Sequence, residues 1–457
     1  MEQRERLGSR LGFILLSAGC AIGMGNVWKF PYLAGQSGGG FFVLIYLLFV
    51  AIMGIPVMTM EFALGRASQK SPVHMHYPLT KKGSPWRIHG WAAYLGVVVL
   101  MMFYAVVAGW MLQYFVKTAS GQFVGMTSEE VVGAFGAMMG NPVEMVGYMA
   151  IVVILGFGIC SFSLQKGVER VTKWMMLALL AIMVVLAVNN IFLPGGKEGL
   201  SFYLKPDMDK VREIGIGTVI VNAMNQSFFS LSLGIGSMAI FGSYINKDRA
   251  LMGEAVNVAI LDTFVAITAG LIIFPACFAY GVQPDAGPPL VFMTLPNIFN
   301  NMAMGRLWGS LFFLFMTFAA LTTVVAVFEA IVACTCDATG WSRKKTCLIA
   351  GIAMFFLCIP CALGFNLWAN FVPFGAGTSI MDIEDLLVSY ILLPLGSLVF
   401  VLFCTSRYGW GWKNFTAEAN EGKGLKVPNW IRFYVTYILP VMIIVLFIIG
   451  MINFPWK

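Results

Sequence analysis

The chain has 457 residues, of which 59% are hydrophobic and 11% are charged, and its mean hydropathy is +0.82. Soluble globular domains contain about 25% charged residues, so the composition excludes an ordinary soluble protein, a disordered chain and a secreted disulfide scaffold. The net charge of +7 is modest and does not indicate a nucleic-acid partner. A multi-pass membrane protein remains, in which apolar runs of about 20 residues each form a spanning helix.

Eleven apolar segments follow one another along the chain, and each is long enough to cross a bilayer. They lie near residues 10–35, 40–65, 90–117, 145–164, 169–193, 214–242, 251–280, 306–336, 346–365, 384–404 and 430–454. Lys and Arg cluster on alternate connections, whereas the connections 118–144 and 366–383 contain neither residue. Because basic residues stay on the cytoplasmic side, we expect a cell-membrane protein with a cytoplasmic N-terminus and an outside C-terminus.

Two of these segments contain glycine-rich, polar interruptions, at 18–26 in the first segment and at 230–237 in the sixth. Glycine lowers helix stability, and Gly-x-Gly next to Asn, Ser or Gln suggests backbone that leaves the helix at membrane depth. Close helix–helix packing through small residues is the alternative explanation of either stretch taken alone.

The positions of the two interruptions favour a transporter. The first and sixth segments occupy matching places in two sets of five, and paired interruptions of this kind mark a binding site at the bilayer midplane. We therefore predict an all-α membrane protein with eleven transmembrane helices, an inverted 5+5 repeat and broken helices one and six. A single domain over 1–457 would contain repeat one (about 10–193), repeat two (about 214–404) and an extra helix (about 430–454).

Several motifs make the chain similar to the neurotransmitter:sodium symporters, and in particular to the prokaryotic, amino-acid-transporting branch of that family. They lie at 10–15, 23–32, 38–41, 226–234 and 321–323, in family order and at compatible spacing. The resemblance covers about residues 4–454. It implies a symporter in which sodium flowing inward drives uptake of an amino acid.

The resemblance also implies two sodium sites built from oxygen donors. The first would use the Ala21 carbonyl, the Asn26 side chain, Ser230 and Asp262, completed by the substrate carboxylate. The second would use the carbonyls of Gly19, Ile22 and Ala319 with the hydroxyls of Thr322 and Thr323. Taken singly, the two threonines could equally bond back to carbonyls one turn earlier in their own helix.

The family pattern places the amino acid beside the first sodium ion. The residues implied are Ala21, Met24, Gly25, Leu100, Tyr104, Phe229, Ser230, Ser232, Ile235, Thr323 and Val327. The substrate carboxylate would bind the Gly25 amide and the Tyr104 hydroxyl, although Tyr104 alone could be a packing aromatic. Gly23 stands where monoamine-transporting relatives have aspartate, which favours a substrate that has its own carboxylate. The apolar side chains in this set predict an aromatic or branched amino acid.

Asp262 bears on the anion requirement. An ionisable group inside a span is expensive and is a functional hypothesis by default. Chloride-dependent relatives have Asn at this position and Ser one turn later, where this chain has Ala266. A fixed carboxylate beside sodium supplies the negative charge that chloride would bring, so we expect transport that needs no chloride.

Charged pairs are expected to close the site at each end. The family pattern implies Lys29 with Asp385 on the outer side, where Lys replaces the usual Arg and Asp382 is a second possible partner. On the inner side it implies Arg4 with Asp337, close to Tyr244. Glu61 is expected to hold the unwound part of the sixth segment.

Other classes of protein explain the sequence less well. A membrane enzyme needs a nucleophile–base pair or a metal cluster within the spans, and neither is visible, so we expect no enzyme. A transport-silent amino-acid sensor on the same fold would usually have an added signalling tail, and a channel would need a continuous polar path. His74, His76 and His89 lie near a connection, where solvated histidines are expected. The oligomeric state is not predicted.

Overall fold

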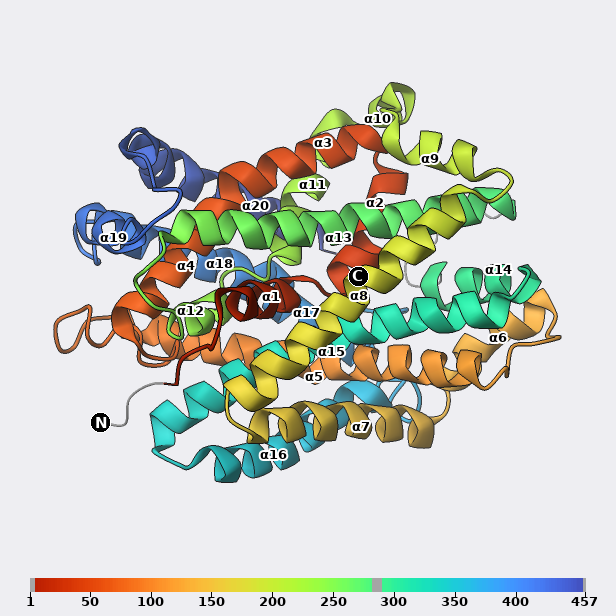
Figure 1. Cartoon of the computed structure of the whole chain (residues 1–457), viewed down its shortest axis with the longest axis horizontal. Coiled ribbons are helices and arrows are strands. Elements are labelled where there is room, and N and C mark those ends of the chain that lie inside the picture. The colour runs from red at the N-terminus through yellow and green to blue at the C-terminus, as the bar shows by residue number, and fades with distance from the viewer. Residues whose placement is uncertain (1–4, 282–289, 455–457) are drawn as a thin grey trace.

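The computed structural model describes residues 5–281 and 290–454. Within these ranges every regular element is a helix and no β-strand is formed. Most of the long helices run side by side along the longest dimension of the molecule (Figure 1). The apolar chain thus folds into a bundle of helices, as the sequence predicts.

Nine helices are long and apolar enough to cross a membrane over the described residues. Five of them are unbroken helices: α5 (Arg87–Ala119), α7 (Pro142–Ser161), α13 (Leu251–Ala279), α15 (Gly305–Thr339) and α16 (Arg343–Leu363). The other four contain short π-helical or 3-10 turns: α3 (Gly40–Phe49) with η2 (Val50–Gly54) and α4 (Ile55–Ser68), η3 (Gln165–Glu169) with α8 (Arg170–Ile191), α17 (Ile380–Asp385) with η5 (Leu386–Leu392) and α18 (Leu393–Thr405), and η6 (Asn429–Ile431) with η7 (Tyr434–Ile438) and α20 (Leu439–Asn453).

The first and sixth predicted segments are each divided into two helices. The first consists of α1 (Arg10–Ala21), followed by η1 (Gly25–Lys29) and α2 (Phe30–Gln36), and it bends by 60° at the break. The sixth consists of α11 (Ile216–Ser230) and α12 (Ser237–Gly242), with irregular backbone between them. Together with the nine continuous helices these make the eleven predicted segments, and the prediction of broken helices one and six is confirmed.

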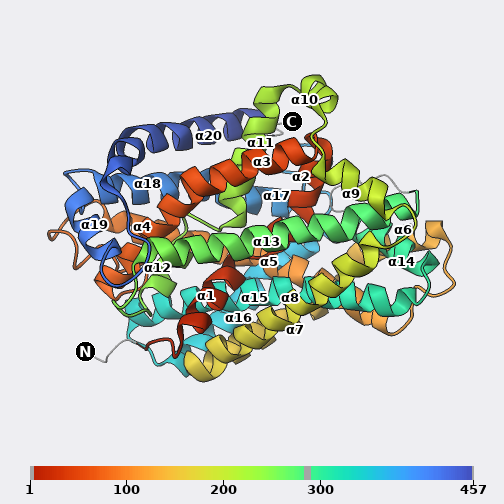
Figure 2. The same cartoon turned by 45° about the horizontal axis from the view of Figure 1, so that its top comes forward.

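Short helices cover the two ends of the bundle. At one end lie α6 (Ser128–Met139), α9 (Gly196–Leu204), α10 (Met208–Ile214) and η4 (Leu290–Thr294) with α14 (Leu295–Asn301). At the other end lie α12 and α19 (Trp412–Ala419), on the side where the N-terminal end of the chain is found (Figure 2). The connection 118–144 is therefore not only a loop, because it contains α6.

The centre of the bundle is built by α1, α5, α13 and α15. Helix α15 packs along α5, and α1 packs against both α13 and α15. Small residues allow the backbone of α12 to approach α4: a Cβ atom on Gly65 would lie 1.8 Å from Ala239 O, and one on Gly242 would lie 2.4 Å from Phe62 O. Close packing through glycine thus occurs next to the break in the sixth segment, at glycines outside the two glycine-rich stretches.

Candidate ion and substrate site

The break in the first span exposes backbone groups at the centre of the bundle. The last backbone hydrogen bond of α1 runs from Ile22 N to Ala18 O at 2.6 Å, and η1 begins only at Gly25. Gly23 is needed at the break because a Cβ atom there would lie 2.5 Å from the Tyr104 hydroxyl. The carbonyl groups of the last turn of α1 are therefore available to other partners.

The break in the sixth span has a left-handed backbone. Ser232, Gly234 and Gly236 have φ angles of 51°, 98° and 72°. Gly234 N donates to Oε1 of Glu61 at 2.6 Å, and Glu61 is fully buried in α4. The expectation that Glu61 holds this segment is confirmed. A buried carboxylate can satisfy amides that a regular helix would have paired internally.

Oxygen atoms of α1 and α15 converge around Thr323. Its hydroxyl oxygen lies 3.1 Å from Gly19 O, 3.0 Å from Ile22 O and 3.3 Å from Ala319 O. Thr322 donates to the same Ala319 carbonyl at 3.0 Å. Both threonines thus form the hydrogen bond to a carbonyl one turn earlier in their own helix that was the alternative explanation. Thr323 additionally contacts carbonyls at the end of α1. One hydroxyl has a single proton, so three carbonyl oxygens around it exceed what the hydroxyl can satisfy.

A second polar cluster surrounds Asp262 of α13. Asn26 Nδ2 donates to its Oδ1 at 2.7 Å and to its carbonyl at 3.2 Å, while the Tyr46 hydroxyl donates to Oδ2 at 3.2 Å. The Tyr46 hydroxyl also lies 3.0 Å from that of Ser230. Gly23 N donates to Asn26 Oδ1 at 3.2 Å. The structure thus brings Asn26, Ser230 and Asp262 together, as the sequence-based prediction requires, with Tyr46 as an additional member.

The expected substrate residues lie around the same breaks. Met24 N donates to the Tyr104 hydroxyl at 3.3 Å, and Gln226 Nε2 donates to Gly25 O at 2.8 Å. The Phe229 ring packs on Gly25, where a Cβ atom would lie 2.7 Å from a ring carbon. The hydroxyl of Ser232 donates to the carbonyl of Cys20 in α1 at 3.4 Å. Gly25, Tyr104 and Phe229 are therefore grouped with the break in the first span.

The remaining expected residues are buried. Ala21, Leu100, Val327 and Ile235 are 3%, 8%, 0% and 1% exposed. Ile235 contacts α5, because a Cβ atom on Gly96 would lie 2.8 Å from Ile235 Cγ2. It also lines a separate cavity between α5 and α18.

The outer charged pair is not formed in this structure. Lys29 Nζ lies 4.0 Å from the centroid of the Phe229 ring, while Asp385 Oδ1 accepts a hydrogen bond from Ser389 at 2.5 Å. Among the described residues no ion pair within 4.0 Å joins Lys29 to Asp385. The second possible partner, Asp382, caps α17 by accepting from Ser379 N at 2.6 Å. The ammonium group faces an aromatic ring, which attracts cations, and the closing of this pair stays a prediction.

At the inner end, Arg4 lies outside the described residues, so its pairing with Asp337 is not described. Asp337 Oδ2 accepts from Ser71 N at 2.8 Å. Tyr244 donates its hydroxyl to Oε1 of Glu329 at 2.7 Å.

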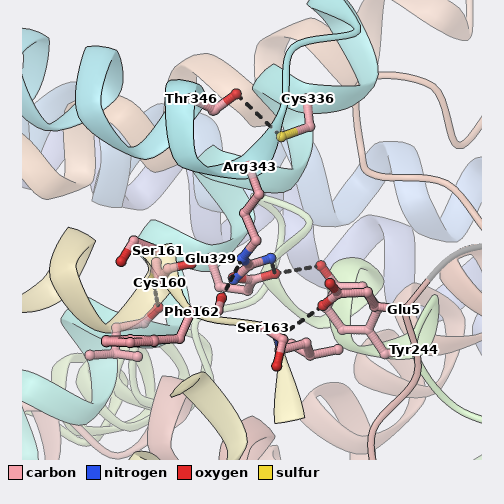
Figure 3. Close-up of polar contacts among 12 residues, drawn as sticks. Glu5, Cys160, Ser161, Phe162, Ser163, Tyr244, Glu329, Cys336, Arg343 and Thr346 are labelled. Atoms are coloured by element: carbon pink, nitrogen blue, oxygen red, sulfur yellow. Dashed lines mark hydrogen bonds and ion pairs between the residues drawn. The ribbon is translucent and has the colours of Figure 1, made fainter. Parts of the chain in front are cut away.

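Glu329 is the centre of a network to which the sequence assigned no role (Figure 3). The carboxylate is fully buried in α15, and Arg343 at the start of α16 forms an ion pair with it, with Nη1 3.1 Å from Oε1. Arg343 Nε lies 2.6 Å from Cys160 O and 2.8 Å from Phe162 O at the end of α7. Arg343 and Tyr244 thus meet at the Glu329 carboxylate, and the end of α7 binds the same arginine. The sequence signal that could have indicated this network is an acidic residue inside a span, followed 14 positions later by an arginine.

Two of the three histidines are not solvated. His76 is 0% exposed and packs on Phe403, with ring centroids 4.7 Å apart. His89 is 8% exposed and packs on Phe400, with ring centroids 4.6 Å apart. Burial lowers the pKa of His76 well below its usual value. The expectation of solvated side chains was wrong for this pair because His76, in the connection before α5, and His89, in α5 itself, both pack on phenylalanine rings of α18.

Comparison with known proteins places this arrangement in a family. The model of the sodium:neurotransmitter symporter family matches residues 4–131 and 134–457. The chain belongs to this family. It is therefore a sodium-dependent symporter and a multi-pass membrane protein.

Individual relatives agree with this assignment. The sodium-dependent transporter YhdH of Bacillus subtilis is 34% identical over 450 residues, covering 98% of each chain. The sodium-dependent serotonin transporter of Drosophila melanogaster is 26% identical over 502 residues, covering 99% of this chain and 77% of that protein. The crystal structure of MhsT in complex with L-phenylalanine matches with a TM-score of 0.87 and 37% identity, covering 98% of this chain and 100% of MhsT. The symporter therefore has the fold of MhsT.

Proposed function

We propose that this symporter uses inward sodium flow to import apolar amino acids, and that it prefers those with aromatic or branched side chains. The observation that carries the proposal is the meeting of the two helix breaks, where backbone carbonyls at the end of α1, hydroxyl groups and Asp262 lie close to Gly25 and Tyr104. MhsT, which binds L-phenylalanine, supports the substrate class. Transport by the family, and not catalysis, is what the relatives' names support.

The two sodium ions would be co-substrates held by oxygen atoms. One ion would bind the Gly19, Ile22 and Ala319 carbonyls together with the hydroxyls of Thr322 and Thr323. Three carbonyl oxygens within 3.3 Å of Thr323 Oγ1, one of which also accepts from Thr322, support this position. The donors are hard oxygens, which alkali and alkaline-earth cations prefer. The other ion would be bound by Ala21, Asn26, Ser230 and Asp262 together with the substrate carboxylate.

The amino acid would complete the first sodium site through its carboxylate. The Gly25 amide and the Tyr104 hydroxyl would bind that group, and the Tyr104 hydroxyl that now accepts from Met24 N would donate to it. The ammonium group would face the carbonyls of Ala21 and Phe229, with the Ser232 hydroxyl. The apolar side chain would lie among Leu100, Phe229, Ile235, Thr323 and Val327, all of which are apolar or have a methyl group.

Chloride would not be required, because Asp262 supplies a fixed negative charge next to the first sodium ion. The geometry supports this: the carboxylate contacts Asn26 and Tyr46 directly, and Tyr46 contacts Ser230. Ala266, one turn along α13, offers no hydroxyl to an anion.

Alternating access would follow from rocking of one group of helices against the other. The moving group would be α1–α4 and α11–α13, and the other group α5, α7, α15 and α16. The repeats would lie near 10–193 and 214–404, with an extra helix near 430–454. Lys29 with Asp385 and Phe229 would close the outer side, and Arg4 with Asp337 and Tyr244 the inner side. The protein would lie in the cell membrane, with its N-terminus in the cytoplasm and its C-terminus outside.

Uptake into proteoliposomes tests the proposal. A panel of labelled apolar amino acids is offered with and without an inward sodium gradient, and with chloride replaced by gluconate throughout. We expect accumulation that needs sodium and persists in gluconate. Accumulation that returns only with chloride would contradict the role of Asp262, and binding without accumulation under either anion would favour a transport-silent sensor.

A further inference from the structure

A second cavity adjoins the proposed substrate site, with which it shares Ile235. It has a volume of about 510 Å³ and is lined by residues of α5, of α18 and of the irregular segment between α11 and α12. Its lining includes Trp86, Ala92, Ile235, Leu395 and Val399. Ligand pockets span about 300–1,000 Å³, so the cavity is large enough for a small molecule.

The mouth of this cavity is apolar and lies on helices that span the membrane. Ile88 is 71% exposed and Leu395 is 36% exposed, and both belong to the lining. Exposed apolar side chains on spanning helices face lipid. A molecule that enters the cavity would therefore come from the bilayer.

One lining residue is polar and lacks a partner. His89 is 8% exposed, and within the described part of the chain neither of its ring nitrogens has a hydrogen-bond partner. His76 stands behind it, with ring centroids 5.3 Å apart, and both of its nitrogens are also without partners. Leaving a buried donor and acceptor unsatisfied costs free energy that a ligand can recover.

The charge of the surroundings restricts the head group of a ligand. No Asp, Glu, Lys or Arg belongs to the described lining of the cavity. The described lining therefore contains no acidic group that would favour a charged His89 imidazole. A neutral imidazole offers one donor and one acceptor. A hydroxyl group, which also donates and accepts, complements it, whereas a carboxylate or ammonium group would find no opposite charge.

We propose that this cavity binds an uncharged single-chain amphiphile from the bilayer, with its hydroxyl head on His89 and its chain along Ala92, Leu395 and Val399. The bound molecule would contact Gly234 and Ile235, which also line the cavity. Because Glu61 holds Gly234 on the other side, the ligand would stabilise one arrangement of the broken sixth helix.

Photolabelling in phosphatidylcholine vesicles tests the site. The probe is a long-chain alcohol with a diazirine near its hydroxyl, and mass spectrometry locates the label. We expect saturable labelling of residues 85–93 and 392–399 that unlabelled alcohol displaces. His89→Leu should weaken labelling about tenfold through loss of the hydrogen bond, and Ala92→Phe, which fills the cavity, should abolish it.

A groove of similar size supplies the control. It has a volume of about 540 Å³ between α7 and α16 and is lined by Ile154, Phe157, Leu348 and Ile352. Its hydroxyl group, on Ser161, already donates to Gly158 O at 2.6 Å. Ile352→Phe should therefore leave the labelling of α5 unchanged.

Three outcomes would overturn the proposal. Equal labelling of both grooves would show general partitioning into apolar surface. Labelling of the wild-type protein that does not saturate would also show general partitioning, and this result does not depend on whether the variants fold. Stronger labelling by the matched long-chain carboxylic acid would contradict the uncharged head group.

Discussion

The charge of Asp262 can be removed with little change of shape by the substitution Asp262→Asn. The amide oxygen can still accept from Asn26 Nδ2, which now lies 2.7 Å from Oδ1. The amide nitrogen can donate to the Tyr46 hydroxyl, which now lies 3.2 Å from Oδ2. The substitution therefore tests the charge and leaves the hydrogen-bond geometry in place.

The magnitude follows from Coulomb's law. A unit charge about 4 Å from the first sodium ion, at an effective dielectric constant of about 20, contributes about 4 kcal/mol. This free energy corresponds to about a thousandfold in sodium affinity. An effect of this size is far larger than the scatter of an uptake assay.

The assay is the sodium dependence of uptake into proteoliposomes, in gluconate and in chloride. The wild-type protein should show the same sodium affinity in both anions, whereas D262N should lose affinity in gluconate and recover part of it in chloride. Asp209→Asn is the matched control, because Asp209 is 95% exposed and pairs with Arg212, at 3.3 Å. It makes the same chemical change far from the site.

The outcome that refutes the reasoning is specific. If D262N takes up substrate in gluconate with the sodium affinity of the wild-type protein, the carboxylate does not supply the charge that chloride would bring. A loss of affinity that chloride does not relieve would show that sodium needs the Asp262 charge but that chloride cannot take its place.

Three further predictions concern single side chains. Thr323→Val should lower sodium affinity about tenfold by removing one oxygen ligand, whereas Thr317→Val should have no effect, because Thr317 donates within its own helix to Phe313 O at 2.7 Å. Glu329→Gln should lower the free energy of unfolding by about 3 kcal/mol, measured by thermal unfolding, because the Arg343 charge, 21% exposed, loses its partner. The folded chain holds the pKa of His76 below its usual value of about 6.5, so the unfolded chain binds a proton at a higher pH than the folded chain. Acid therefore lowers the free energy of unfolding through this group. His76→Phe should reduce that loss below about pH 6.5.

Each of these predictions has a contrary result. Equal sodium affinities of T323V and T317V would contradict the second sodium site. An unchanged unfolding temperature of E329Q would mean that Arg343 is sufficiently hydrated without its partner. An identical pH profile of H76F would assign the acid sensitivity to other groups.

Much of the architecture was predictable because a bilayer imposes strong rules on sequence. Apolar runs of about 20 residues must form helices, since no water is present to satisfy the backbone. Glycine clusters in the first and sixth segments indicated where the helices break, and both breaks are present. The connection 118–144 was less predictable: α6 depends on the local cap in which Thr127 and Glu130 exchange hydrogen bonds.

The tertiary structure decided the partners of buried polar groups. Glu329, Arg343 and Tyr244 come from three separate parts of the chain, and only their packing reveals the shared carboxylate. His76 and His89 were predicted to be solvated but are buried against α18.

The sequence by itself therefore determined the helical membrane fold, the two breaks and the family, because local composition controls whether a segment spans the bilayer and where its helix fails. Only the tertiary structure decided which side chains meet across the breaks. Lys29 illustrates the difference, since its charge faces the Phe229 ring at 4.0 Å and not the expected Asp385. The partner of a buried charge depends on distances between helices, and no local pattern along the chain encodes those distances.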